Sequence, residues 1–278
     1  MLPILLSLGP VIIYSYGIVL SIGLFLGLYW WWKMGRDEHY DEISLFDGYF
    51  LSLVIFLVAG RLGYVFLHFA DLGTLYRTLA LLAFPGISVI SGAIVSVVFL
   101  LFFARAQAWD QWKVLDSLVV VFSLISIFGG IAGLFNGSNP GRVVSWGLVY
   151  PGQKVPRIPV DVWIFLWALA TFGVVSSVRK NFRFYAWYKA EASVVREGLA
   201  TLIFGVSLGV YYLVIPWLEA APWKWQMIPD DAIVGILILF FSTYLIYRRV
   251  GRKTSAWAER LREMKLNLLQ WVRHIRRE

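Results

Sequence analysis

Residues 118–142 read LVVVFSLISIFGGIAGLFNGSNPGR, in which a long apolar run passes into a glycine-dense segment that ends in two asparagines and an arginine. An apolar run of this length is typical of a membrane-spanning helix. Polar side chains at membrane depth cost free energy unless they pair or bind a ligand, and glycine lets a backbone approach a ligand closely. We therefore expect residues 129–142, called the hinge below, to contact a lipid headgroup.

The rest of the chain has the same apolar character. Its 278 residues are 59% hydrophobic and 15% charged, which excludes a soluble domain of this length. The stretches long enough to cross a bilayer core of about 30 Å are residues 10–32, 45–69, 87–104, 113–135, 160–178, 199–218 and 231–247. The predicted fold is an all-α integral membrane protein of about seven transmembrane helices, with one membrane domain over residues 1–250.

The loops between these spans differ in their content of lysine and arginine. Of the 25 such residues, 19 fall in the loops on the side of the C-terminus and 5 on the other side, while Arg61 lies within a span. Positive loops stay in the cytoplasm. We therefore expect a cytoplasmic C-terminus, an N-terminus outside and a hinge that opens outward. Residues 1–6 carry no positive charge, which argues against a cleaved signal peptide.

The net charge of +8 resides mostly in the C-terminal tail, residues 251–278. Apolar residues recur there at spacings of three and four among arginines and lysines, which predicts a basic amphipathic helix in the cytoplasmic membrane interface. The alternative is a solvated tail that only enforces topology. Such a charge favours an anionic leaflet over nucleic acid. The aromatic and basic residues of segment 179–198 predict a membrane anchor.

Cysteine is absent from the chain. Disulfides, thiolate metal sites and a thiol nucleophile of the protein are therefore excluded. We predict no metal and no cofactor, and any thiol chemistry would use a sulfur atom of the substrate.

Arg61 is the one basic residue deep within an apolar span. Burial of a guanidinium in lipid costs several kcal/mol, so Arg61 should face the bundle interior, where its planar group suits a phosphate. The alternative is a pairing with helix carbonyls or with a carboxylate such as that of Asp161.

Residues 136–159 contain no acidic residue, so this loop is a positive surface that could hold phosphate. Asn136 and Asn139 could bind headgroup hydroxyls, although a role as helix caps is the commoner one beside glycine. Arg142 could bind the same ligand or extend into the headgroup layer without one.

His68 is the only histidine on the predicted outer face. Its imidazole could take a proton from a thiol, or it could be an ordinary interfacial residue. Asp47 and Asp116 lie near the cytoplasmic ends of their spans, where we expect helix caps rather than catalytic acids.

Several motifs follow one another in a fixed order from Gly9 to Arg249. They are Gly9-Pro10, YSYG at residues 14–17, GRLGYV at 60–65, Leu115-Asp116, the hinge, WGLVYPG at 146–152 and YRR at 247–249. In this order they resemble the bacterial prolipoprotein diacylglyceryl transferases. Those enzymes move a diacylglyceryl group from phosphatidylglycerol to the cysteine thiol of a lipoprotein precursor.

The hinge signature of that family reads Gly-Arg-x-x-Asn-Phe-x-Asn-Gly-Glu-x-x-Gly-Arg. The chain matches it at Gly129, Asn136, Gly137, Gly141 and Arg142.

The chain departs from the family pattern at several polar positions. Gly130, Gly133 and Ser138 stand where the signature has arginine, asparagine and glutamate, and Ile90 stands where the family has its proposed base. The arginine and glutamate of the family's sixth span are absent between residues 198 and 218. A base and phosphate donors are each worth roughly 10²-fold or more in rate.

The resemblance implies a cavity that opens to the outer leaflet and binds phosphatidylglycerol or another anionic phospholipid, with the signal peptide of a lipoprotein precursor as second partner. Its lipid-binding residues would be Tyr16, Arg61, Tyr64, Asn136, Gly137, Asn139, Gly141, Arg142 and Arg157. In this interpretation Arg61 and Arg142 hold the phosphate, Asn136 orients the glycerol, and His68 is the candidate base. The location implied is the plasma membrane of a bacterium.

Two other function classes stay open. A catalytically degenerate relative would bind phospholipid or precursor without reaction. A small-molecule transporter would have broken helices near the membrane midplane, whereas the hinge is expected at the outer edge.

Overall fold

The computed structural model describes residues 4–8, 11–72, 74–80, 84, 86–151, 153–188, 197–220, 224–225 and 228–249. Within these ranges seven helices are long and apolar enough to cross a membrane. They are α1 Ser15–Asp37, α2 Glu42–Leu67, α5 Val89–Ala106, α6 Gln111–Asn136, α7 Val160–Tyr188, α8 Leu199–Val214 and α9 Asp230–Arg249. The predicted all-α, seven-span membrane fold is confirmed. The predicted tail helix at 251–278 and residues 189–196 of the predicted anchor lie outside the described residues.

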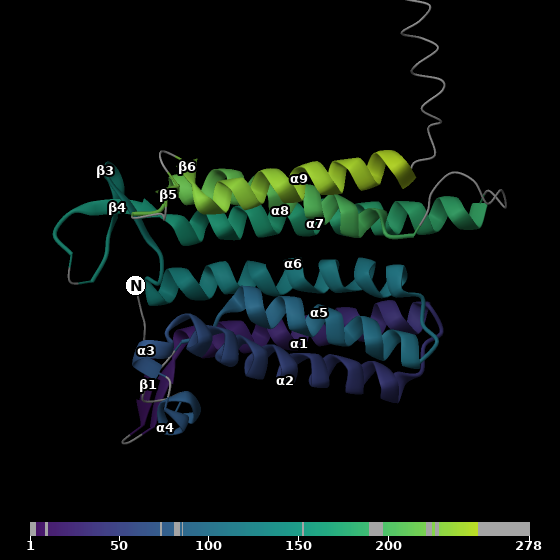
Figure 1. Cartoon of the computed structure of the whole chain (residues 1–278), viewed down its shortest axis with the longest axis horizontal. Helices are drawn as coiled ribbons and strands as arrows, with labels where there is room; N and C mark the ends of the chain where they lie inside the picture. The colour runs from purple at the N-terminus through teal and green to yellow at the C-terminus, as the bar shows by residue number, and fades with distance from the viewer. Residues whose placement is uncertain are drawn as a thin grey trace, which may run out of the picture.

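Helix α6 lies between two groups of helices (Figure 1). It packs on α1, which contacts α2, and α2 contacts α5. On its other side α6 packs on α7, while α8 and α9 pack on each other. The part of the chain that the structure describes begins at the end of the bundle where α6 finishes, and α9 finishes at the opposite end (Figure 1). Which end faces the cytoplasm stays a prediction.

Aspartate caps set the starts of two spans. The Asp41 carboxylate accepts from the backbone N–H of Ser44 at 2.9 Å at the start of α2, and that of Asp110 accepts from Trp112 at 2.8 Å at the start of α6. A capping side chain satisfies an N–H that has no partner within its helix. These helices therefore begin two or three residues before the apolar runs that predicted them.

The larger buried cluster includes Trp31, Leu45, Tyr49, Leu100 and Val114 of α1, α2, α5 and α6, and it extends to Val175 of α7 and Ala200 of α8. Two of its aromatic side chains donate hydrogen bonds to backbone carbonyls. The Trp31 indole donates to the Leu45 carbonyl at 2.9 Å, and the Tyr49 hydroxyl donates to the Leu24 carbonyl at 2.7 Å. The cluster therefore holds α1 against α2 and also includes residues of α7 and α8.

Three small antiparallel hairpins, which the sequence did not predict, complete the described fold. They pair β1 Ile4–Leu8 with β2 Val11–Tyr14, β3 Pro140–Val149 with β4 Pro156–Pro159, and β5 Lys224–Trp225 with β6 Ile228–Pro229. Because β2 takes up residues 11–14, the first span starts at Ser15 rather than at residue 10. Short helices α3 Phe69–Leu72 and α4 Leu75–Leu79 follow α2, and a 3-10 turn η1 Ile215–Trp217 follows α8.

Candidate functional site

The hinge begins where α6 ends. Gly137 has φ 69° and ψ 40°, a left-handed conformation that glycine adopts without steric cost, and its N–H donates to the Gly133 carbonyl at 2.7 Å. The chain then reverses into β3. The exposed Asn136 amide donates to the Ser138 hydroxyl at 3.0 Å, so Asn136 remains at the surface of the turn.

Asn139 is bound to a carboxylate on the next span. Its side-chain amide donates to Asp161 Oδ1 at 2.7 Å and its backbone N–H donates to Oδ2 at 3.3 Å. The Tyr150 hydroxyl in turn donates to the Asn139 carbonyl at 3.5 Å. Asp161 is therefore not the partner of Arg61, which was one of the alternatives left open by the sequence.

Two arginines, one in the hinge and one beside it, have N–H groups without a hydrogen-bond partner among the described residues. Arg142 is held by its backbone N–H on the Leu218 carbonyl at 2.9 Å and by Nε on the Glu219 carbonyl at 3.3 Å. No described residue hydrogen-bonds its two terminal nitrogens. Arg157 donates from Nη1 to the Gly141 carbonyl at 3.2 Å, and its Nε is buried without a hydrogen-bond partner among the described residues. The arrangement could take an anion.

Gly141 lets two backbone segments meet between these arginines. A Cβ there would lie 2.7 Å from the Ile158 carbonyl and would also meet the Leu218 carbonyl. Gly141 forms an isolated bridge with Glu219. This glycine therefore joins the β3–β4 hairpin to the end of α8.

Helix α7 fills the space next to two signature positions on α6. A Cβ on Gly130 would lie 2.8 Å from the Phe165 backbone nitrogen, and one on Gly133 would lie 2.7 Å from Asp161 Cγ. A real Cβ does not approach so closely without a shift of its neighbours. The arginine and asparagine of the family pattern therefore cannot be accommodated while α7 keeps this position.

Arg61 lies elsewhere, on α2, and is buried with 5% of its surface exposed. Its Nε, Nη1 and Nη2 donate to the carbonyls of Thr78, Gly86 and Arg77 at 2.8, 2.9 and 2.6 Å. The alternative of carbonyl pairing is thus present, with two carbonyls of α4 and the Gly86 carbonyl as acceptors. Its role as a phosphate ligand stays a prediction.

His68 caps α2 and stacks on Tyr64, with ring centroids 4.3 Å apart. Its Nδ1 lies 3.0 Å from the Tyr64 carbonyl. Since a carbonyl only accepts, neutral His68 carries its proton on Nδ1 and leaves Nε2 free to take another. Tyr64 also lies against Gly86, so the Arg61 and His68 contacts form one group. Tyr16 is exposed on α1.

The predicted site residues thus fall into two groups at the same end of the bundle. Arg61, Tyr64 and His68 form one, while Asn139, Gly141, Arg142 and Arg157 form the other. Across the described part of the chain, no hydrogen bond, ion pair or ring contact joins the two groups.

Two carboxylates at this end were not predicted as site residues. Asp161 lies in the first turn of α7, where the helix N-terminus favours a negative charge. Glu219 is half-buried next to Arg142, and burial together with the like charge of Asp231 raises the pKa of its carboxyl. A signal was present, since Glu219 is the only acidic residue between Glu197 and Asp230.

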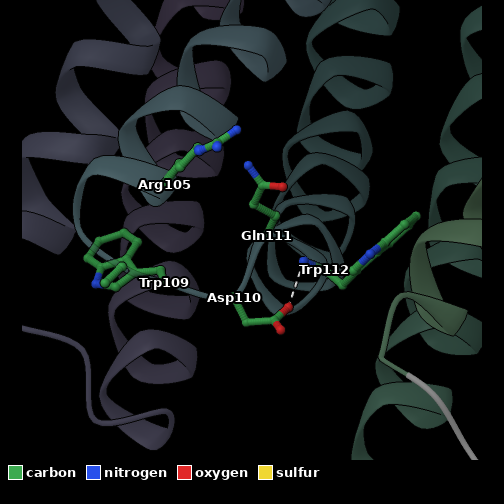
Figure 2. A pocket seen from close by; sticks show the side chains of 6 residues that line it. Arg105, Trp109, Asp110, Gln111 and Trp112 are labelled. Atoms are coloured by element: carbon green, nitrogen blue, oxygen red, sulfur yellow. Dashed lines mark hydrogen bonds between the residues drawn. The ribbon is translucent and has the colours of Figure 1, made fainter.

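An open cavity of about 370 Å³ lies at the other end of the bundle, at the turn from α5 to α6 (Figure 2). It is lined by Arg105, Ala108, Trp109, Asp110, Gln111 and Trp112. The dashed line in Figure 2 is the bond by which Asp110 caps α6. None of the predicted site residues lines this cavity.

The sequence model of the prolipoprotein diacylglyceryl transferase family matches residues 3–247 of the chain. A phosphatidylglycerol–prolipoprotein diacylglyceryl transferase of Desulfotalea psychrophila is 30% identical over 221 residues, 77% of this chain and 79% of that protein. One of Rickettsia rickettsii is 24% identical over 261 residues, 88% of this chain and 95% of that protein. One of Agrobacterium fabrum is 29% identical over 181 residues, 58% of this chain and 62% of that protein.

Proposed function

The chain belongs to the prolipoprotein diacylglyceryl transferase family, and from that membership we propose that it transfers a diacylglyceryl group from phosphatidylglycerol to the cysteine thiol of a lipoprotein precursor. It is a multi-pass membrane protein. We propose further that it lies in the plasma membrane of a bacterium, with the hinge toward the outer leaflet. The second partner would be the signal peptide of the precursor.

The observation that carries this proposal is the pair of cations at the hinge. Arg142 has two terminal nitrogens without a described partner, and Arg157 has a buried Nε without one. A phosphate would satisfy these donors, since arginine binds phosphate through several N–H groups at once. Asn136 is exposed at the end of α6 and is proposed to orient the glycerol.

The reaction divides into three tasks. A base takes the proton of the substrate thiol, the thiolate attacks the glycerol carbon that carries the diacyl unit, and the C–O bond to phosphate breaks. Arg142 and Arg157 would stabilise the negative charge on the departing glycerol phosphate. The product holds a new C–S thioether bond.

The base is proposed to be one of two residues. His68 offers its Nε2, since Nδ1 donates to the Tyr64 carbonyl, and Glu219 offers a half-buried carboxylate on the residue whose backbone carbonyl accepts from Arg142. An imidazole is the most frequent general base in enzymes. Glu219 has the advantage of its place next to the proposed phosphate site.

A second function is favoured by one specific observation. Helix α7 lies against Gly130 and Gly133, the positions at which the family pattern has two polar side chains. A protein with this closed α6–α7 contact and the remaining arginines would bind phosphatidylglycerol without transferring it.

Complementation separates the two functions. The chain is expressed in a bacterium depleted of its own transferase, and the mass of a reporter lipoprotein is measured. The transferase is supported if the reporter gains the mass of one diacylglyceryl unit and if this gain is lost in Asn136→Ala and Arg142→Ala. Arg105→Ala, at the opposite end of the bundle, is the control and should keep the gain. No gain from folded protein that copurifies with phosphatidylglycerol would support the binding protein.

A further inference from the structure

Asp161 is one of the few charged side chains enclosed within the described bundle, with 1% of its surface exposed. Both of its carboxylate oxygens accept hydrogen bonds from a single residue, Asn139, which lies 22 positions earlier in the chain. We propose that Asp161 is a positioning residue that fixes the conformation of the hinge and so places Asn136 and Arg142 for the headgroup. The expected effect of Asp161 on transfer rests on the proposed function. Its expected effect on the conformation of the hinge does not.

The carboxylate holds Asn139 at two points, and a tyrosine holds it at a third. Asp161 engages the side-chain amide and the backbone N–H, and the Tyr150 hydroxyl engages the backbone carbonyl. Asn139 therefore has both of its backbone polar groups and its side chain fixed. Since Asn139 lies between Gly137 and Arg142, the path of the chain across the hinge is determined on either side of it.

The position of the carboxylate depends on a glycine of α6. Asp161 Oδ1 occupies the place next to Gly133 where a side chain would begin, and the Gly133 carbonyl accepts from the N–H groups of Gly137 and Ser138. One residue of α6 thus supplies both the space for the carboxylate and the acceptor that ends the helix. A methyl group there would push Asp161 away from Asn139.

Among the residues that the structure describes, no ion pair involves Asp161. The ion pairs of the described residues join Lys113 and Arg179 to Glu38 and Glu197, all at the opposite end of the bundle. The N–H groups of Asn139 and the N-terminus of α7 are what stabilise the carboxylate. Because a buried polar group left without a partner is costly, Asp161 and Asn139 are each required by the other.

An aspartate differs from an asparagine at this position. Both oxygens of a carboxylate accept, so Asp161 receives two donors at once, whereas an amide has one acceptor oxygen and an NH₂ group. In Asp161→Asn, that NH₂ would face one of the two donors of Asn139, either its backbone N–H or its side-chain NH₂. If the two residues are exchanged, the amide of residue 161 donates to the carboxylate of residue 139 and its oxygen accepts the backbone N–H. The hydrogen bonds are restored with the charge on the other side.

The test compares four full-length proteins in phosphatidylglycerol vesicles: wild type, Asp161→Asn, Asn139→Asp, and the exchanged double variant. Hydrogen exchange of the amides at residues 136–142 is measured together with transfer to a synthetic signal peptide that carries a cysteine. In both single variants we expect faster hydrogen exchange and a loss of about 10²-fold in transfer. The loss should appear in kcat, because a misplacement of reacting groups has this effect. In the double variant we expect both the exchange rate and the transfer rate to recover.

The outcomes separate this inference from the proposed function. The wild type could lack transfer activity while the hinge amides of the four proteins still exchange in the expected pattern. That result would contradict the transferase function and support the positioning role of Asp161. Single variants that match the wild type in exchange, or a double variant no better than the worse single one, would overturn the inference. If a single variant does not fold, the double variant must fold, and its failure to do so would also overturn it.

Discussion

The carboxylate of Asp116 on α6 caps a different helix, α8, where Oδ1 accepts from the backbone N–H of Thr201 at 2.8 Å. The same oxygen accepts from the Thr201 hydroxyl at 2.6 Å, and Oδ2 accepts from the Gly198 N–H at 2.8 Å. The predicted role of Asp116 as a cap is confirmed, but the helix that it caps begins 83 residues further along the chain. The start of α8 is thereby tied to α6.

Removal of this cap should destabilise the protein. In Asp116→Ala, two backbone N–H groups at the start of α8 lose their acceptor, and we expect a cost of about 2–3 kcal/mol. Asp47 is exposed near the same end of α2, and Asp47→Ala should change stability by less than about 0.5 kcal/mol. Thermal unfolding in one detergent would measure both. Equal melting temperatures for the two variants would contradict the capping role.

Three glycines of α6 should respond differently to alanine. Gly130→Ala and Gly133→Ala place a methyl group against α7, which should cost about 1–3 kcal/mol through overpacking. Gly129→Ala meets nothing within 4 Å and should be neutral or stabilising, because alanine is the better helix former. Melting temperatures of the three variants test this contact. A neutral Gly130→Ala would show that α7 does not lie where the structure has it.

Arg61 should act as a tether of the segment that follows α2. Arg61→Ala leaves three carbonyls without their donor, and each buried unsatisfied group costs about 1–3 kcal/mol. We expect faster hydrogen exchange at residues 74–80 in Arg61→Ala and also in Arg61→Lys, because one ammonium cannot match the planar geometry of three acceptors. Unchanged exchange in Arg61→Lys together with weaker phosphatidylglycerol binding would instead favour the predicted phosphate role.

The pH profile of transfer should identify the base. The pKa of the Glu219 carboxyl is raised by burial and by the like charge of Asp231. A general base works only when it is deprotonated. With Glu219 as the base, the transfer rate should therefore rise with pH, with a midpoint above 4.5, the ordinary pKa of a glutamate carboxyl. Asp231→Asn removes the like charge and should move this acidic limb to lower pH.

Two further variants complete that assignment. Glu219→Gln should abolish the acidic limb if Glu219 is the base, while His68→Gln should leave it in place. The reverse pattern would assign the proton transfer to His68.

Most of the fold could be predicted because each span is a long apolar run whose length is fixed by the bilayer. The ends of the spans were less certain, because they depend on single residues. Asp41 and Asp110 start their helices ahead of the apolar runs, and α7 continues to Tyr188, ten residues past its predicted end. The hairpins escaped prediction because their strands, apart from the ten-residue β3, are short and because they lie in apolar or glycine-rich sequence.

The site was predictable only in part. The glycines and asparagines of the hinge mark it within the sequence, and Gly137 does adopt the left-handed conformation that ends α6. The pairing of Asn139 with Asp161 depends on how α7 packs on α6, which no spacing along the chain reveals. The same holds for Arg61, whose carbonyl acceptors belong to a segment without a regular pattern.

Arg61 also constrains how the chain enters the membrane during synthesis. All three of its acceptors, the carbonyls of Arg77, Thr78 and Gly86, follow it in sequence. Helix α2 is therefore synthesised before the carbonyls that accept hydrogen bonds from its guanidinium. A translocating α2 must therefore keep Arg61 hydrated until residues 77–86 have been translated. The first two spans would then be released into lipid only as a unit with the segment that follows them.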